Sequence, residues 1–263
     1  MTTTAQAELH YEVAGEGPPV VLVHEAIADS RMWEPQWSTF PPVHRTVRYD
    51  MRGFGETPIS PGSFSHARDL VGLLERLALG PAAVVGCSLG GRVALEVAVA
   101  RPELVSALVL VDPGLPGHDW TKETQAGWAE EEAALDRGDL DAAVELNLRM
   151  WVDGPGRSPG DVAAGVRERV AVMQRRAFEL QVPVGDEAEE EPLVPDLAQR
   201  VTEIGVPTLI VVGEEDRPDM HAIADRLAGS IPHAQRATIP ATAHIPSLER
   251  PEEFDRIVLE FLS

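Results

Sequence analysis

The residues best suited to chemistry lie in one short segment, residues 86–90, which reads Gly-Cys-Ser-Leu-Gly. An apolar run, residues 82–85, comes directly before it, and residues 89–100 are typical of a helix. Glycines on both sides of a serine allow a sharp strand-to-helix turn that lifts the hydroxyl out of the sheet. Ser88 is therefore the candidate nucleophile, and the backbone N–H of Leu89, at the head of the helix, is a candidate oxyanion donor.

A serine hydroxyl is a weak nucleophile unless a base takes its proton, and the base needs an orienting partner. Of the eight histidines, His244 alone lies in a loop between a predicted strand, residues 237–239, and the last predicted helix. Asp112 and Asp216 each follow a predicted strand and each lie between Ser88 and His244 in the chain. We therefore take His244 as the candidate base and keep both aspartates as candidates for the orienting acid.

The elements around these residues alternate between buried strands and amphipathic helices. Residues 19–23 form a continuous apolar run, typical of a strand that is covered on both faces. Other predicted strands are residues 7–13, 46–49, 82–85, 107–111 and 207–212, and predicted helices are residues 66–79 and 89–100. This alternation predicts an α/β protein with a mostly parallel sheet and helices on both faces.

The alternation stops after Asp112, and residues 118–182 have a helical pattern throughout. Residues 183–195, with the acidic run 186–191, are predicted to be an exposed connector. We therefore expect one sheet domain in two parts, residues 1–114 and 201–263, interrupted by a helical insertion, residues 115–200.

Further segments resemble the α/β-hydrolase superfamily, in the family's order along nearly the whole chain. They are residues 21–24 (a strand ending in His), 50–55 (Asp-x-Arg-Gly-x-Gly), 213–216 (Gly-x-x-Asp) and Ala243-His244, with Glu249 and Pro251 behind it. The resemblance implies the α/β-hydrolase fold of a serine-nucleophile member, with the helical insertion as its cap.

The same resemblance implies roles for individual residues. The order Ser–Asp–His favours Asp216 as the acid, while some members take it from the position of Asp112. His24 matches a structural histidine, and the second oxyanion donor would be the backbone N–H of Ala26. This sequence departs from the family at Glu25, where glycine is usual. Glu25 either lines the pocket mouth, with a part in substrate choice or proton handling, or points outward as a solvated charge.

Composition limits the partners. The chain has 43 acidic and 22 basic residues and a formal net charge of −21, so nucleic acid and anionic membranes are not expected to bind. Cys87 is the single cysteine, which excludes an intrachain disulfide. The first residues lack the features of a signal peptide and no apolar run could span a bilayer, so a cytoplasmic monomer or homodimer is expected. No metal-ligand spacing or nucleotide motif is present, so no metal or cofactor is implied.

The expected reaction is hydrolysis of a small, fairly apolar carboxylic ester, lactone or thioester through an acyl-serine. Of the five tryptophans, Trp33 and Trp151 are the candidates to line an apolar substrate pocket. Carbon–carbon bond hydrolysis, perhydrolysis and acyl transfer use the same triad and stay open. A ligand-binding member of the fold without turnover is the alternative from another class.

Overall fold

A computed structural model describes residues 8–263; Ala7, the first residue of the predicted N-terminal strand, lies outside the described residues. A seven-stranded sheet runs through the molecule in the order β1-β3-β2-β5-β6-β8-β9, in which β1 is antiparallel to β3 and the other neighbours are parallel. Its strands are β1 Tyr11–Ala14, β2 Pro19–Val23, β3 Arg45–Tyr49, β5 Ala82–Cys87, β6 Val105–Val111, β8 Thr208–Gly213 and β9 Gln235–Ile239. The predicted mostly parallel sheet is confirmed.

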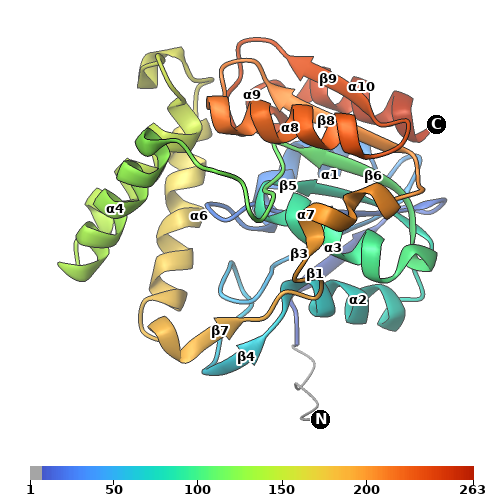
Figure 1. The fold of residues 1–263 in the computed structure, drawn as a ribbon, viewed down its shortest axis with the longest axis horizontal. Coiled ribbons are helices and arrows are strands. Elements are labelled where there is room, and N and C mark those ends of the chain that lie inside the picture. Colours follow the sequence, from blue (N-terminus) through green and yellow to red (C-terminus); the bar gives the residue numbers. More distant parts are fainter. Residues whose placement is uncertain (1–7) are drawn as a thin grey trace.

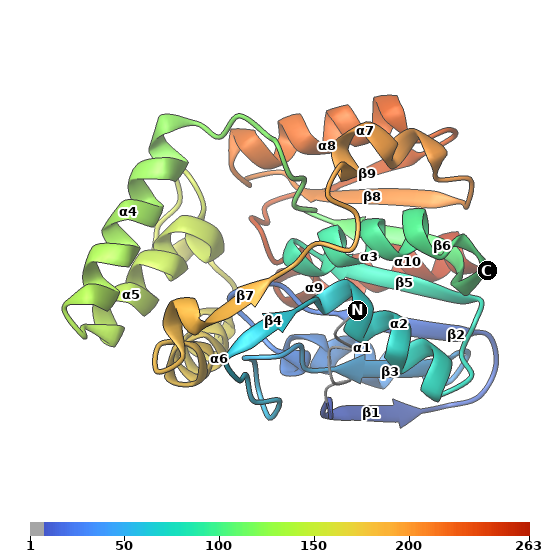
Figure 2. The ribbon, with the colours of Figure 1, turned by 60° about the horizontal axis from the view of Figure 1, so that its bottom comes forward.

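Helices cover both faces of this sheet, so the apolar central strands are shielded from water on either side. Helices α2, α3 and α8 lie on one face, and α1 and α10 lie on the other (Figure 2). The helices outside the predicted insertion are α1 Glu34–Thr39, α2 His66–Arg76, α3 Leu89–Ala100, α8 Pro218–Ser230, α9 Pro246–Glu249 and α10 Pro251–Leu262. Helix α7 Leu197–Arg200 lies at the C-terminal end of the insertion and packs against α3. Val20 to Val23 of β2 and the residues around them form the buried core.

The segment between β6 and β8 is mainly helical, as its pattern predicts. It contains α4 Lys122–Asp136, α5 Leu140–Asn147, a π-helical turn at Leu148–Asp153 and α6 Val166–Gln181. These helices stand together beside one end of the sheet (Figure 1). The division into domains at residues 114/115 and 200/201 stays a prediction.

The acidic connector is largely exposed, as its composition predicts, but it also contains a strand that the pattern did not predict. Strand β7 Ala188–Glu190 pairs in parallel with β4 Gly62–Phe64, and Glu190 bonds the guanidinium of Arg92 at 2.6 Å. Arg92 lies on α3, about a hundred positions earlier in the chain. The composition of the connector therefore gave no indication that Glu190 pairs with it. The connector is therefore tied to the sheet domain, although part of it is exposed. Within residues 8–263, no helix is long and apolar enough to cross a membrane.

Candidate active site

Ser88 occupies the turn between β5 and α3 in a strained backbone conformation, with φ +49° and ψ −108°. A side chain on either neighbouring glycine would prevent this turn. A Cβ on Gly86 would lie 2.3 Å from the Gly90 carbonyl oxygen, and a Cβ on Gly90 would lie 2.4 Å from that of Val23. Glycine is thus required at both positions, because the backbone of another residue lies too close to leave room for a side chain. This steric requirement explains the two glycines of the sequence motif.

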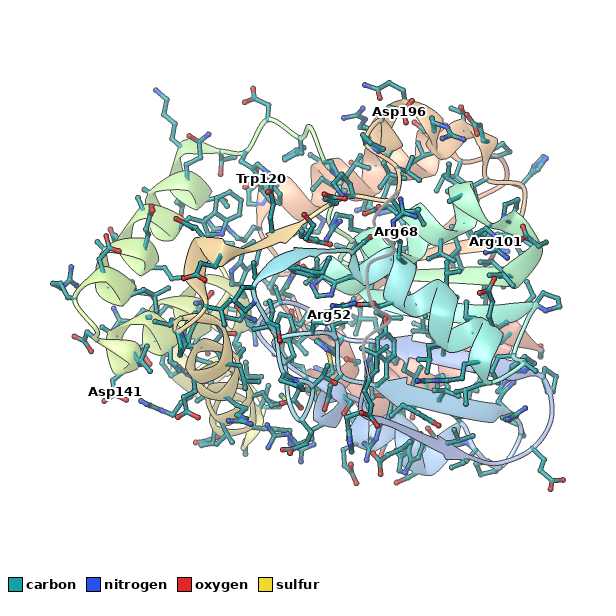
Figure 3. The ribbon with its side chains drawn as sticks, turned by 90° about the horizontal axis from the view of Figure 1, so that it is seen from below. Arg52, Arg68, Arg101, Trp120, Asp141 and Asp196 are labelled. Carbon is teal, nitrogen blue, oxygen red and sulfur yellow. The ribbon has the colours of Figure 1, made fainter. Side chains whose placement is uncertain are left out.

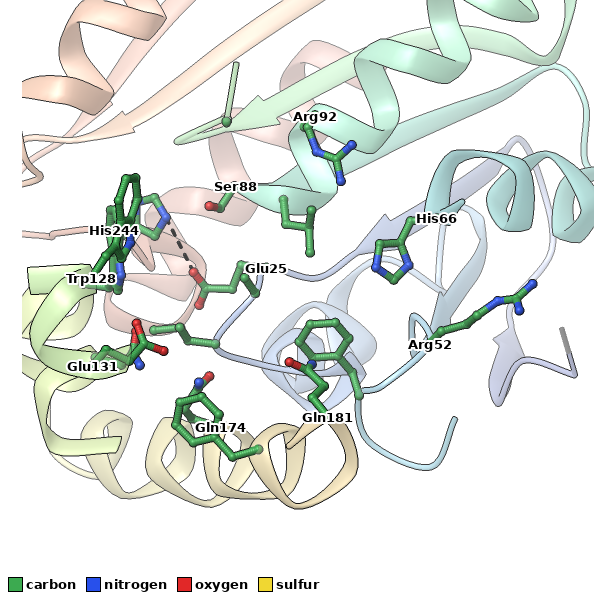
Figure 4. Close-up of a pocket in the computed structure, with 18 of the residues that line it drawn as sticks. Glu25, Arg52, His66, Ser88, Arg92, Trp128, Glu131, Gln174, Gln181 and His244 are labelled. Carbon is green, nitrogen blue, oxygen red and sulfur yellow. Dashed lines mark ion pairs between the residues drawn. The ribbon is translucent and has the colours of Figure 1, made fainter. Parts of the chain in front are cut away.

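His244 and Asp216 form a buried pair beside this turn. His244 Nδ1 lies 2.7 Å from Asp216 Oδ2, and Asp216 Oδ1 accepts a hydrogen bond from the Arg217 backbone N–H. Figure 4 shows the Ser88 hydroxyl on the same side of the cavity as the His244 ring and directed toward it. The fold therefore brings together the three residues that the sequence singled out, although they lie 128 and 28 positions apart in the chain.

The loops that carry the acid and the histidine are packed against each other. A Cβ on Gly213 would lie 1.9 Å from the Ala243 carbonyl oxygen, so only glycine fits at the end of β8. The Ala243 N–H donates to Glu249 Oε1 at 2.7 Å, and Glu249 pairs with Arg157 from the helical segment. Glu249, noted in the sequence only by resemblance, thus fixes the backbone next to His244.

Asp112, the other candidate acid, is buried behind Asp216. Both of its carboxylate oxygens accept from the Gly213 N–H, at 3.2 and 3.3 Å. Burial raises the pKa of Asp112 well above its usual value, and the charge of Asp216 raises it further. The ligand atoms of Asp112, Asp216 and His244 all lie within 4.8 Å of one another. Asp216 bonds His244 directly, whereas Asp112 lies one carboxyl further from the histidine.

The loop after β2 lies beside the turn that carries Ser88. His24 is buried, its Nδ1–H donates to the Glu25 carbonyl at 2.7 Å, and its Nε2 accepts from the Met51 N–H at 2.9 Å. Burial lowers the pKa of His24, which agrees with a neutral ring that donates and accepts. His24 therefore fixes the loop that carries Ala26. Ala26 and Leu89 both line the cavity next to Ser88.

The cavity has a volume of about 650 Å³ and lies between the sheet and the helical segment (Figure 4). Its wall is rich in large apolar and aromatic side chains. These are Ile27, Phe54, Ile59, Phe64, Leu115, Trp120, Trp128, Trp151, Phe178 and Met220. Trp151 lies 4.7 Å from the His244 ring, centroid to centroid, and its backbone carbonyl accepts a hydrogen bond from the backbone N–H of His244.

Trp33 lies elsewhere, so its expected place in the pocket is corrected. It is fully buried at the end of the 3-10 turn Ser30–Trp33, and its ring packs 6.1 Å from that of Phe254 on α10. Trp33 is not among the described residues that line the cavity. Closeness in sequence to the loop after β2 suggested the pocket, but the chain turns inward first and buries the indole against α10.

Glu25 points inward and lines the cavity rather than facing solvent as a surface charge. It is 1% exposed, its Oε2 lies 3.7 Å from His244 Nε2, and its Oε1 has no hydrogen-bond partner among the described residues (Figure 4). Burial raises the pKa of Glu25 to about 7, although the neighbouring His244 opposes the shift. A carboxyl thus faces the ring nitrogen that a serine nucleophile would need as its base.

Replacing Glu25 with glutamine is expected to move the acidic limb of the kcat/KM profile to lower pH. Burial alone would lower the pKa of His244, and the charge of Arg217 lowers it too. The carboxylates of Asp216 and, to a smaller extent, Glu25 raise this pKa by more, so the net shift is upward. Without the Glu25 charge, the imidazolium loses one stabilising partner and gives up its proton at lower pH. The measurement is kcat/KM from pH 5 to 9, with the exposed Glu252→Gln as the matched control. A profile unchanged from wild type would contradict this role.

Two arginines also line the cavity, and both are matched by acids. Arg52 donates to Asp69 through Nε at 2.6 Å, and Arg92 pairs with Glu96 at 2.5 Å as well as with Glu190. Figure 3 shows Arg52 between α6 and α2, and its side chain is partly buried. Because their charges are compensated within the protein, neither guanidinium is available as a strong anion site.

The helical segment supplies wall residues that sequence reasoning missed. Trp128 and Glu131 of α4, Asn147 of α5 and Gln174 of α6 all line the cavity. The i, i+3 spacing of Trp128 and Glu131 puts both on one helical face and was a usable signal. The sequence around Asn147 and Gln174 gave no such signal, because these two residues lie on other helices and meet Trp128 and Glu131 only in the folded protein.

The chain matches the family described as alpha/beta hydrolase fold over residues 18–251 and therefore belongs to it. A hydrolase from Pseudomonas aeruginosa PA01 has a similar structure, with a TM-score of 0.80 at 26% identity, covering 100% of this chain and 97% of that one. A thermophilic esterase from Thermogutta terrifontis gives a TM-score of 0.79 at 26% identity, covering 99% and 95%. The 2-hydroxy-6-oxononadienedioate/2-hydroxy-6-oxononatrienedioate hydrolase of Burkholderia vietnamiensis is 27% identical, covering 98% of this chain and 91% of its own. These three relatives are named as two hydrolases and an esterase.

Proposed function

We propose that this protein is a serine hydrolase that cleaves a small, fairly apolar carboxylic ester, lactone or thioester through an acyl-enzyme on Ser88. One observation carries the proposal. Ser88 sits at a strained turn in the wall of a 650 Å³ cavity that it shares with the hydrogen-bonded pair of His244 and Asp216. A buried histidine, oriented by a carboxylate at one nitrogen, leaves its other nitrogen for a nucleophile.

In the proposed reaction, Ser88 Oγ attacks the carbonyl carbon while His244 Nε2 takes the hydroxyl proton. The N–H groups of Ala26 and Leu89 would hold the oxyanion, and Asp216 would stabilise the imidazolium. The bond from the acyl carbon to the leaving group then breaks, and the leaving group takes the proton from His244. Water, deprotonated by His244, attacks the acyl-serine and releases the acid and free Ser88.

The lining of the cavity favours a substrate whose reacting end is uncharged. Its apolar and aromatic side chains suit an alkyl or aryl group, and Trp151 is proposed to contact the substrate beside His244. The relative from Burkholderia vietnamiensis has a dioate in its name, whereas the two arginines of this cavity are already paired with acids. This pairing supports an ester, lactone or thioester over a dianionic substrate, for which a carbon–carbon hydrolase would need unpaired cations.

The test is labelling by an active-site-directed fluorophosphonate, followed by peptide mass spectrometry and by turnover of p-nitrophenyl acyl esters of graded chain length. We expect one label, on Ser88, and turnover that depends on acyl length. Ser88→Ala provides the matched control and should take no label. A folded protein that neither takes the label nor hydrolyses any ester would favour the ligand-binding alternative instead.

A further inference from the structure

The far wall of the cavity carries an acceptor cluster that the proposed catalytic steps do not use. The cluster consists of Glu131 on α4, Asn147 on α5 and Gln174 on α6, all of which line the cavity. Figure 4 shows Glu131 and Gln174 on the side of the cavity opposite Ser88, with Glu25 between. A substrate held at Ser88 would therefore direct its far end toward this cluster.

Gln174 has an unused acceptor inside the cavity. Its side chain is 3% exposed, and its Oε1 has no hydrogen-bond partner among residues 8–263. A buried amide oxygen without a partner costs free energy, because it has given up water without a replacement. A ligand that brings a donor to this atom would recover that cost.

Glu131 is a carboxyl without a cationic partner in the described part of the chain. Burial raises its pKa, and a hydrogen bond from Asn147 offsets the rise only in part. Asn147 also donates to the Ala143 carbonyl at 3.2 Å, and it is itself buried. The carboxyl therefore has no compensating cation among the described residues, in contrast with the two arginines of the same cavity, which are paired with acids.

Aromatic rings lie next to the acceptor cluster. Trp128 precedes Glu131 by one helical turn, and its ring centroid is 4.9 Å from that of Trp120 in an edge-to-face arrangement. Both indoles line the cavity. Indole faces attract alkyl chains and cations, and a protein with a net charge of −21 attracts cations rather than anions.

We propose that the acceptor cluster is a subsite for the far end of the substrate's acyl chain, and that this end carries a hydrogen-bond donor, either a hydroxyl or an ammonium group. The subsite rests on the proposed hydrolase function and adds a substrate class to it. The substrate is then an ester, lactone or thioester of a hydroxyacyl or aminoacyl group, apolar along the chain and polar at its end. An acyl group that ends in a carboxylate is excluded by Glu131.

The test compares kcat/KM for p-nitrophenyl esters of equal acyl length that end in a methyl, hydroxyl or ammonium group. Wild type should prefer a donor-terminated ester over the methyl-terminated one at one optimal length. Gln174→Met keeps the volume but removes the acceptor, and it should reduce that preference about tenfold. Glu131→Gln should reduce it for the ammonium ester more than for the hydroxyl ester. Glu132→Gln, exposed on the same helix, is the matched control and should change nothing.

Comparing the hydroxyl-terminated and ammonium-terminated esters shows which donor the subsite takes. Equal kcat/KM values for the methyl, hydroxyl and ammonium esters would overturn the proposal. Failure of the subsite is distinguishable from failure of the hydrolase function, because Ser88 labelling and methyl-ester turnover would persist. A second measurement is independent of turnover. Linear alkylammonium ions and alkanediols should perturb tryptophan fluorescence in Ser88→Ala, and the perturbation should weaken in the Gln174→Met, Ser88→Ala double variant. No difference between these two proteins would also overturn it.

Discussion

Replacing Ser88 with alanine is expected to lower kcat for the best p-nitrophenyl ester about a million-fold. The hydroxyl is the only group proposed to bond to the acyl carbon, and alanine cannot form the acyl-enzyme. The change removes one oxygen from a partly exposed side chain, so little stability should be lost. The measurement is steady-state turnover, with circular dichroism and a thermal melt to establish that the variant is folded.

The strained turn makes this a sharp test. Alanine at position 88 keeps a side chain at φ +49°, so the backbone, the N–H of Leu89 and the cavity should persist. Substrate binding, measured as KM or by a non-hydrolysable analogue, should therefore change little while kcat collapses. Turnover within a hundredfold of wild type would contradict the assignment of Ser88, because water attack without the nucleophile cannot supply it.

Replacing Asp216 with asparagine is expected to lower kcat about ten-thousandfold. The Asp216 carboxylate accepts the Nδ1–H of His244 at 2.7 Å and would balance the charge of the imidazolium. An amide can present its NH2 group to Nδ1, which favours the tautomer with a proton on Nε2. That nitrogen then cannot take the Ser88 proton. The measurement is kcat at pH 8, where residual activity is easiest to separate from background hydrolysis.

Asp112→Asn is the matched control for this prediction, because it makes the same change one carboxyl further from His244. Burial and the charge of Asp216 both raise the pKa of Asp112 and favour its neutral form, so a neutral amide there should cost little activity. The reverse ranking, with Asp112→Asn the more damaging, would make Asp112 the acid of the triad. Equal and large losses would show that the two carboxyls act as a unit.

Local sequence was sufficient for the parts of the fold that local physics controls. The apolar run at residues 19–23 and the helical periodicity at residues 66–79 correspond to β2 and α2, since burial pattern and period specify the type of element. The need for glycine at positions 86 and 90 could also be inferred from the sequence motif, and the structure explains it, because a Cβ at either position would lie 2.3–2.4 Å from a backbone oxygen. Strand ends, in contrast, differ from the prediction by up to four residues: β6 begins at Val105 rather than at residue 107, and β1 begins at Tyr11 rather than at residue 7.

The surroundings of individual side chains depend on segments that are far apart in the sequence and meet only in the folded protein. The sequence could not choose between an inward and an outward Glu25, because the answer depends on a histidine 219 positions later. Trp33 was assigned to the pocket by its neighbourhood in the chain, yet it is buried against Phe254. The acidic run, whose composition indicated an exposed connector, contains a strand that pairs with β4. Its Glu190 also pairs with Arg92 on α3.

By itself, the sequence determined the alternation of elements, the glycine-bounded serine turn and the order of the candidate triad. Each of these is encoded in residues close together in the chain or in a repeating pattern. Only the tertiary structure decided which carboxyl bonds His244, that both cavity arginines are neutralised, and that Gln174 and Glu131 face the same space as Ser88. Those properties depend on distance and burial between segments far apart in sequence, and electrostatic interactions in a buried site are set by that geometry.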